Sequence, residues 1–125
     1  MTANDLTRIV CKKGMQVHRN LGPGLFESVY EECLEFELEK EGLIINQQKS
    51  IPIIYDGVLI KSEAFRADLI INDKLLLELK SVKALNDIHL TQTITYLKLS
   101  NLKLGLLINF NVALFKTGVK RVINS

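Results

Sequence analysis

The sequence lacks tryptophan, contains only two prolines and two cysteines, and has no long hydrophobic run. Its apolar runs are only a few residues long, as at 75–77 and 106–108, whereas about 20 apolar residues are needed to cross a bilayer. No basic and then apolar leader opens the chain, and Cys11 and Cys33 are too few for a disulfide scaffold. We therefore expect a cytoplasmic protein without a membrane span, whose two cysteines are reduced and packed.

The composition indicates one folded domain that occupies residues 1–125. Hydrophobic residues make up 47% and charged residues 24% of the chain, which are ordinary values for a globular protein and exclude a disordered one. The net charge of +2 conceals a segregation, since residues 21–42 carry a net charge of −6 and residues 81–125 a net charge of +5. An acidic cluster beside a basic third is typical of metal-dependent phosphodiester enzymes, and a solvated surface of mixed sign is the alternative interpretation.

Two helices are predicted in the first third of the chain. Apolar residues recur at helical spacing from Leu6 to Leu21, with Asn4 or Asp5 as the cap, and the turn at 20–24 ends this helix. A second helix is predicted over 25–40. Its expected apolar arc consists of Phe26, Val29, Tyr30, Cys33, Leu34, Phe36 and Leu38, and the glutamates expected on the opposite side are Glu31, Glu32, Glu35 and Glu39. Glu27, at the edge of the arc, and Glu37, near its centre, depart from this pattern.

The rest of the chain is predicted to alternate between strands and one further helix. Strands are expected at 51–55, 58–60, 65–71, 75–80, 104–110, around 114–115 and at 119–123. Asp56 and Gly57 form the turn between the first two strands, and Asn86 or Asp87 caps a helix over 88–100. The order α-α-β-β-β-β-α-β-β predicts an α+β domain in which helices flank a mixed β-sheet.

Two acidic residues lie within predicted strands, where apolar side chains are the rule. Asp68 lies in the strand at 65–71, and Glu78 and Lys80 share one face of the strand at 75–80 because side chains alternate. A three-residue turn at 72–74 would place Asp68 opposite Glu78 and Arg66 opposite Lys80, whereas a two-residue turn would put Asp68 on the other face. Asn and Asp tolerate the left-handed conformation of such turns, which favours the three-residue turn.

Adjacent carboxylates repel each other, and a divalent cation relieves the repulsion. Mg²⁺ (or Mn²⁺) prefers oxygen ligands, and Lys80 is placed to orient or deprotonate an attacking water and to offset charge on a phosphate. The alternative interpretation is that Asp68, Glu78, Arg66 and Lys80 form ion pairs on a solvated face of the sheet.

Three motifs occur in a characteristic order. Residues 24–30 read G-x-x-E-x-x-Y, residues 78–80 read E-x-K, and residues 92–96 read Q-x-x-x-Y. With Asp68 between the first two motifs, the chain resembles the GxxExxY family, a small branch of the PD-(D/E)XK nuclease-like superfamily, from about Asp5 to Ile123. Ala67 stands where the superfamily's name has proline.

The resemblance implies a fold, an activity and roles for particular residues. It implies a restriction-endonuclease-like core in which Asp68, Glu78 and Glu27 bind Mg²⁺ (or Mn²⁺) and Lys80 assists the water. It also implies that Gln92 and Tyr96, with His89 nearby on the same helix, support the site or contact nucleic acid. We expect a nuclease that acts on DNA or RNA, and since 125 residues leave little beyond the core, a homodimer or a partner protein. The alternative is a binding or regulatory module that has kept the fold.

Other candidates carry less weight. His18 is placed to reach the site across the glycine-proline turn or to be a surface or capping residue, and Glu37 is expected to pair with a lysine from the sheet in a structural role. Five basic residues in the last third are candidates for phosphate contacts or for solubility, namely Lys98, Lys103, Lys116, Lys120 and Arg121.

Overall fold

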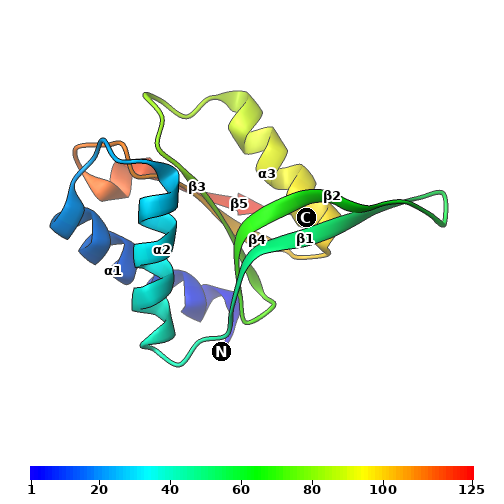
Figure 1. Ribbon diagram of the computed structural model, residues 1–125, viewed down its shortest axis with the longest axis horizontal. Helices are drawn as coiled ribbons and strands as arrows, with labels where there is room; N and C mark the ends of the chain where they lie inside the picture. Colours follow the sequence, from blue (N-terminus) through cyan, green and yellow to red (C-terminus); the bar gives the residue numbers. More distant parts are fainter.

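A five-stranded mixed sheet carries helices on both of its faces (Figure 1). The computed structural model describes residues 1–125. The elements are α1 (Ala3–Leu21), α2 (Glu27–Glu39), β1 (Ile45–Tyr55), β2 (Val58–Ile71), β3 (Leu75–Lys80), α3 (Asp87–Ser100), β4 (Leu104–Asn109), the short 3-10 helix η1 (Phe115–Gly118) and β5 (Val119–Ile123). The strands lie in the order β1-β2-β3-β4-β5, and only β3 and β4 are parallel. This architecture confirms the predicted α+β class.

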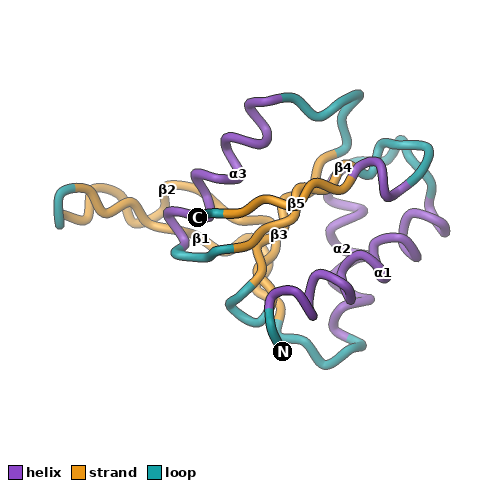
Figure 2. The backbone as a smooth tube through the Cα atoms, turned by 180° about the vertical axis from the view of Figure 1, so that it is seen from behind, coloured by secondary structure: helices purple, strands orange, loops and turns teal.

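The sheet separates two hydrophobic cores (Figures 1 and 2). The larger core joins α1 and α2 to alternate residues of β3, including Leu75, Leu77 and Leu79, and Cys11 and Cys33 pack against it as free thiols. The smaller core joins Leu97 of α3 to the opposite face of the sheet. None of the three helices combines the length and the apolarity that crossing a bilayer requires.

Local hydrogen bonds explain where the helices begin. The hydroxyl of Thr2 accepts from the Asp5 amide (3.1 Å) while the Asp5 carboxylate accepts from the Thr2 amide (2.9 Å). This reciprocal capping box makes Thr2 the cap of α1, two residues before Asn4 and three before Asp5, so the prediction of Asn4 or Asp5 as the cap was wrong. Asn86 caps α3 by accepting from the amides of Ile88 and His89, which confirms one of the two predicted caps.

The strands differ from the prediction in three places. β1 begins at Ile45, six residues before the predicted start at 51. The residues at 58–60 and 65–71 belong to a single strand, β2, because the polar stretch between them continues to pair with β1. Leu114 precedes the 3-10 turn of η1, where both the amide and the hydroxyl of Thr117 donate to its carbonyl, so no strand forms at 114–115. The observed order is therefore α-α-β-β-β-α-β-β, with η1 before β5.

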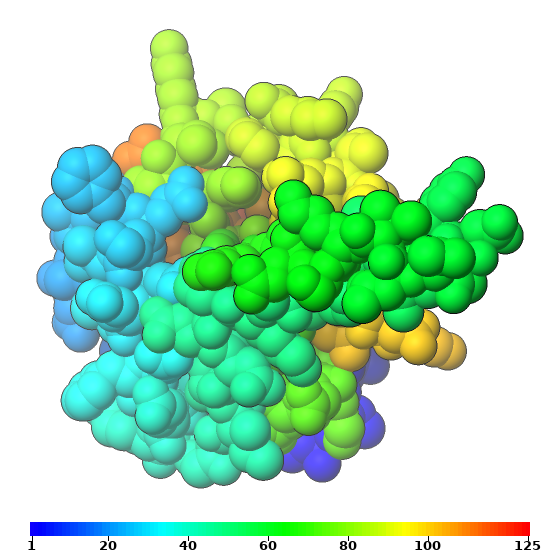
Figure 3. All heavy atoms as spheres, turned by 45° about the vertical axis from the view of Figure 1, so that its right-hand side comes forward, coloured from blue at the N-terminus to red at the C-terminus, as the bar shows by residue number.

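The far halves of β1 and β2 form a two-stranded arm, residues 51–65, that projects from the body of the protein (Figures 1 and 3). Its turn is the predicted one, since Asp56 and Gly57 both have positive φ angles (53° and 74°) and Tyr55 pairs with Val58. Five large apolar side chains near the tip are more than half exposed, namely Ile54, Tyr55, Val58, Leu59 and Ile60. The arm exists because β2 pairs with β1 along most of its length but with β3 only over Leu69–Ile71.

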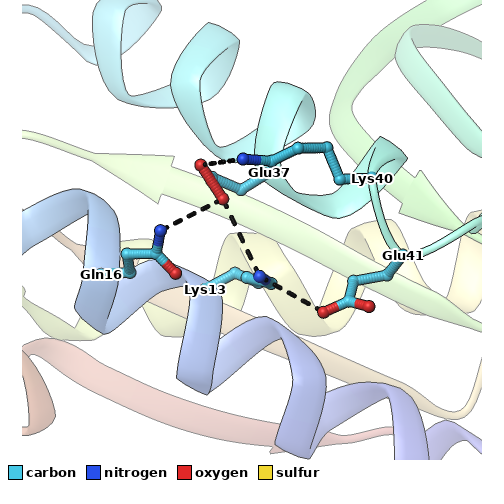
Figure 4. Close-up of polar contacts among 5 residues, drawn as sticks. All are labelled: Lys13, Gln16, Glu37, Lys40 and Glu41. Carbon is cyan, nitrogen blue, oxygen red and sulfur yellow. Dashed lines mark hydrogen bonds and ion pairs between the residues drawn. The ribbon is translucent and has the colours of Figure 1, made fainter.

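Glu37 joins α1 and α2 rather than α2 and the sheet (Figure 4). Its carboxylate lies 3.0 Å from the Lys40 ammonium and 3.8 Å from that of Lys13, and it accepts from the Gln16 amide (3.4 Å). Lys13 also pairs with Glu41 at 3.3 Å. The prediction of a structural role was thus consistent with the contacts, but the predicted partner from the sheet was wrong, because α1 packs directly against this side of α2.

Replacement of Glu37 by Ala should lower the free energy of unfolding by about 1 kcal/mol, because a mostly buried carboxylate with three partners is lost. Urea denaturation of this variant and of Glu39→Ala, an exposed glutamate on the same helix, measures the difference. In 1 M NaCl the loss should shrink, because salt screens ion pairs. Equal stability of the two variants at low salt would contradict a stabilising role for Glu37.

Candidate active site

Asp68 and Glu78 meet where β2 and β3 separate. The three-residue turn at 72–74 is confirmed, since Ile71 pairs with Leu75 and Asn72 and Asp73 both have positive φ angles (50° and 55°). The backbone ladder ends at Leu69 and Leu77, one pair before Asp68 and Glu78 would be opposite each other. Side chains replace it there, because Glu78 Oε1 accepts from the Asp68 amide (3.3 Å) and Asp68 Oδ2 accepts from the Leu79 amide (2.8 Å).

The expected pairing of Arg66 with Lys80 was wrong. Because β2 has already left β3 at this level, Arg66 pairs with Ser50 of β1 and is exposed, while Lys80 pairs with Asn109 of β4. None of the ion pairs in the structure involves Asp68, Glu78, Arg66 or Lys80. The alternative interpretation of these four residues as ion pairs on a solvated face is therefore also wrong.

Burial makes the two acids unusually weak. Glu78 is only 5% exposed, and burial, reinforced by the neighbouring charge of Asp68, raises its pKa to about 8. Burial also raises the pKa of Asp68, against the hydrogen bond from the Leu79 amide, and the charges of Glu31 and Glu27 add to this rise. Near neutral pH, Glu78 therefore holds a proton in the absence of a cation.

Lys80 completes this part of the site. It is the last residue of β3, it is half-buried, and it shares the strand face of Glu78. Its positive charge acts to lower the pKa of Glu78, although burial outweighs this effect. An ammonium group without an ion-pair partner therefore lies close enough to the acids to act on them electrostatically.

The first turns of α2 bring two further carboxylates toward the acids, and only one of them was expected. Glu31 is buried (8% exposed) and accepts from Gln47 Nε2 (2.8 Å) and Gln48 Nε2 (2.8 and 3.1 Å), so its predicted position on the solvent side was wrong. Glu27 is exposed, as the first residue of α2, yet its charge still acts on Asp68. The spacing 27, 31, 34, 38 follows one helix face, which could have revealed Glu31 beside the buried Leu34 and Leu38.

Gln48 was missed altogether. Its φ angle of 49° is unusual for a residue with a side chain, and it lies in β1 between the pairs Gln47–Leu69 and Lys49–Ala67, at the position opposite Asp68. Its amide donates to Glu31 and, at 3.3 Å, to Asp68 Oδ1. A strained backbone that aims a side chain at acidic groups is typical of functional sites, but no sequence signal distinguishes Gln48 from Gln47.

Tyr30, the tyrosine of the G-x-x-E-x-x-Y motif, fixes the loop that leads into α2. Its hydroxyl donates to the Gly22 carbonyl (2.6 Å) and accepts from the Leu25 amide (3.1 Å). Its ring is fully buried and stacks on Phe110 at 4.5 Å between centroids. Tyr30 therefore ties the start of α2, and with it Glu27, to the end of the sheet.

The residues of the Q-x-x-x-Y motif lie on α3 at different distances from the acids. Tyr96 is half-buried, stacks on Phe65 at 4.0 Å, and has a pKa raised by burial and by the charges of Glu78 and Asp68. Gln92 is exposed. His89 accepts from the Asn86 amide (3.2 Å), which makes it part of the cap of α3. Of the three, Tyr96 is the residue that the structure brings close to the carboxylates.

His18 lies apart from this site. It is buried, its Nε2 lies 2.7 Å from the Val112 carbonyl oxygen, and its ring packs 5.9 Å from that of Phe115. Neither the predicted reach to the site nor the surface alternative is correct, because η1 and the loop before it cover this end of α1.

The donor atoms set limits on what the site can hold. No group of three or more His, Cys, Asp or Glu side chains is arranged to hold a metal ion. Asp68 and Glu78 offer a pair of carboxylates, which suits Mg²⁺ or Mn²⁺ because these ions commonly take one or two carboxylates and complete their shell with water and substrate oxygens. Glu31 already accepts hydrogen bonds from the side-chain amides of Gln47 and Gln48, and Glu27 is exposed at the rim of the site. The residues therefore fit a two-carboxylate cation site.

A comparison with protein families identifies the superfamily. The family model described as the PD-(D/E)XK nuclease superfamily matches residues 4–122. The mixed sheet with three helices is consistent with the fold of that superfamily. No curated protein and no solved structure matches the chain.

The burial of Glu78 has a consequence for the pH dependence of stability. The folded chain holds this proton up to about pH 8, whereas the unfolded chain releases it near the ordinary value of 4.5. Between these values the folded state binds more protons, so its stability falls as the pH rises. In EDTA, wild type should lose on the order of 4 kcal/mol more than Glu78→Gln between pH 4.5 and 8. Urea denaturation across this range tests this, with the exposed Glu63→Gln as control, and parallel profiles for wild type and Glu78→Gln would contradict it.

Substitutions at Gln48 should separate its backbone strain from its amide. Gln48→Ala keeps a side chain in the left-handed region and removes the donors to Glu31 and Asp68, so it should destabilise the protein by about 2 kcal/mol. Gln48→Gly removes the same donors but accepts the positive φ angle, so it should be more stable than the Ala variant by about 1 kcal/mol. Urea denaturation measures both, and a Gly variant less stable than the Ala variant would show that the positive φ angle is absent.

Proposed function

Because the chain belongs to the PD-(D/E)XK nuclease superfamily, we propose that it is a metal-dependent nuclease that hydrolyses phosphodiester bonds of DNA or RNA. The observation that supports this most strongly is the meeting of Asp68 and Glu78 at the separation of β2 and β3, with Lys80 on the same strand face as Glu78. Burying two acids together is costly, and titratable groups with such perturbed pKa values are concentrated at functional sites. The motif at 24–30 supports a place in the GxxExxY branch.

Asp68 and Glu78 would hold Mg²⁺ or Mn²⁺, with Glu27 at the rim of the site. The bound cation would supply positive charge to the phosphate and make a water molecule more acidic. The amides of Asp68 and Leu79 already fix the orientation of the two carboxylates, so little reorganisation is needed. The carboxyl group of Glu78 would release its proton to solvent on becoming a ligand.

Lys80 has the central catalytic role in this proposal. Its ammonium group donates a hydrogen bond that orients the attacking water and offsets charge that develops on the phosphate oxygens. Tyr96 supports the site, because its hydroxyl lies within the field of both acids. Gln92, exposed on the same helix, contacts the nucleic acid, and His89 holds the start of that helix. A homodimer or a partner protein completes the grip on the substrate, since the core fold takes up nearly all of the chain.

A cleavage assay with plasmid and single-stranded DNA and RNA, in Mg²⁺ and in Mn²⁺, tests this function. Wild type should cleave at least one substrate, and Asp68→Asn and Lys80→Ala should each be slower by a factor of about 100 or more, because a metal ligand or the hydrogen-bond donor to the attacking water is lost. Lys61→Ala, on the exposed arm, should match wild type. Equal rates for all four proteins would reveal a contaminating nuclease. Binding without cleavage by wild type in either metal would favour a binding or regulatory module.

A further inference from the structure

A pocket of about 350 Å³ lies beside the candidate active site, at the start of α2. It is lined by Gly24, Leu25, Phe26, Val29, Ser81 and Asn111. Ser81 directly follows Lys80, and Phe26 directly precedes Glu27. The pocket therefore adjoins the backbone at Lys80 and at Glu27. In Figure 3 the start of α2 (light blue) lies beside the segment after β3 (yellow-green), and these two segments supply most of the lining of the pocket.

Hydrogen bonds hold the walls of this pocket in place. The Ser81 hydroxyl donates to the Leu25 carbonyl (2.5 Å), which joins the end of β3 to the loop before α2. Asn109 and Val82 exchange two hydrogen bonds (3.0 and 3.1 Å), and Asn111 Nδ2 donates to the Val82 carbonyl (3.2 Å). Because these contacts lie within the protein, the pocket is formed before any ligand enters, as small-molecule sites usually are.

Phe26 is the exceptional residue of the pocket. Its side chain is 82% exposed, the highest value among the large apolar residues of the chain, although it was expected to pack in the apolar arc of α2. Phe36 on the same helix is 63% exposed, but Lys40 covers its ring at 4.9 Å. The free face of an aromatic ring at the edge of a nuclease site is a surface on which a base can stack.

We propose that this pocket receives one unpaired nucleobase of the substrate strand, which stacks on Phe26 next to the phosphate at Asp68 and Glu78. This rests on the proposed function, because it takes the substrate to be a nucleic acid. The volume is at the low end for ligand sites and suits a single base. The Asn111 carboxamide oxygen and the Ser81 hydroxyl are the polar groups that hydrogen-bond to the edge of the base in this proposal. A base inside the pocket has no room for its complement, so the preferred substrate is single-stranded or locally opened.

Stacking in the pocket can be measured without cleavage. Single-stranded oligodeoxynucleotides that carry 2-aminopurine, titrated in EDTA, should lose fluorescence with wild type as the base stacks. Phe26→Ala and Phe26→Leu should both abolish the quenching and weaken binding about tenfold, because a stacked base contributes roughly 1–3 kcal/mol. Phe26→Tyr should restore both signals. Phe36→Ala is the matched control and should behave as wild type. A duplex of the same sequence should bind wild type and Phe26→Ala equally.

The outcomes separate this proposal from the proposed function. Equal quenching and equal affinity for wild type, Phe26→Ala and Phe26→Leu would overturn the proposal that a base binds in this pocket, even if the wild type cleaves nucleic acid. Quenching that depends on Phe26, in a protein that cleaves no substrate, would support the proposed base pocket and contradict the proposed nuclease function. An oligonucleotide with an abasic position in place of 2-aminopurine should bind wild type and Phe26→Ala alike. A loss of affinity in Phe26→Ala with that oligonucleotide would also overturn the proposal.

Discussion

The site depends on the point at which two antiparallel strands stop pairing with each other. Beyond Leu69 and Leu77, β2 turns away to accompany β1, while β3 continues beside β4. The amides left without a ladder partner, those of Asp68 and Leu79, donate instead to the carboxylates of Glu78 and Asp68. The same two side chains thus satisfy the backbone where the sheet opens and present acidic groups to whatever enters the opening. Carboxylates at these two positions therefore serve both the fold and the site, because a buried amide without a hydrogen-bond acceptor is costly.

The tyrosine of the first motif, Tyr30, holds the start of α2 beside this opening. Tyr30 is buried against Phe110 and holds the loop before the helix by two hydrogen bonds. Residues on its exposed side, Phe26 and Glu27, therefore have a fixed position relative to the ends of β3 and β4. Farther along the helix, Glu31 is held by two glutamine amides of β1. The spacing of the motif is thus explained by one buried anchor and one carboxylate placed one helical turn before it.

Local chemistry made part of this structure predictable. Asn72 and Asp73 tolerate positive φ angles, so the three-residue turn, and with it the meeting of Asp68 and Glu78, followed from the residues. The buried position of Glu31 was missed, because the apolar arc drawn from Phe26 put this glutamate on the solvent side, whereas Phe26 and Phe36 of that arc are exposed in the folded chain. Gln48 could not be predicted, since its left-handed backbone is imposed by the contacts it makes with α2 and β2. Tertiary contacts determine the positions of Glu31 and Gln48, whereas the local turn determines the meeting of Asp68 and Glu78.

The arm has a mechanical relation to the acid pair. Its two strands continue into the body of the protein past Ile51 and Ala67, which are buried in the smaller core with Leu97 of α3, and reach Gln48 and Asp68 only beyond that core. Gln48 donates a hydrogen bond to Asp68, so the strands that form the arm also carry residues of the acidic centre. A movement of the exposed tip would therefore have to disturb the packing against α3 before it could reach the carboxylates.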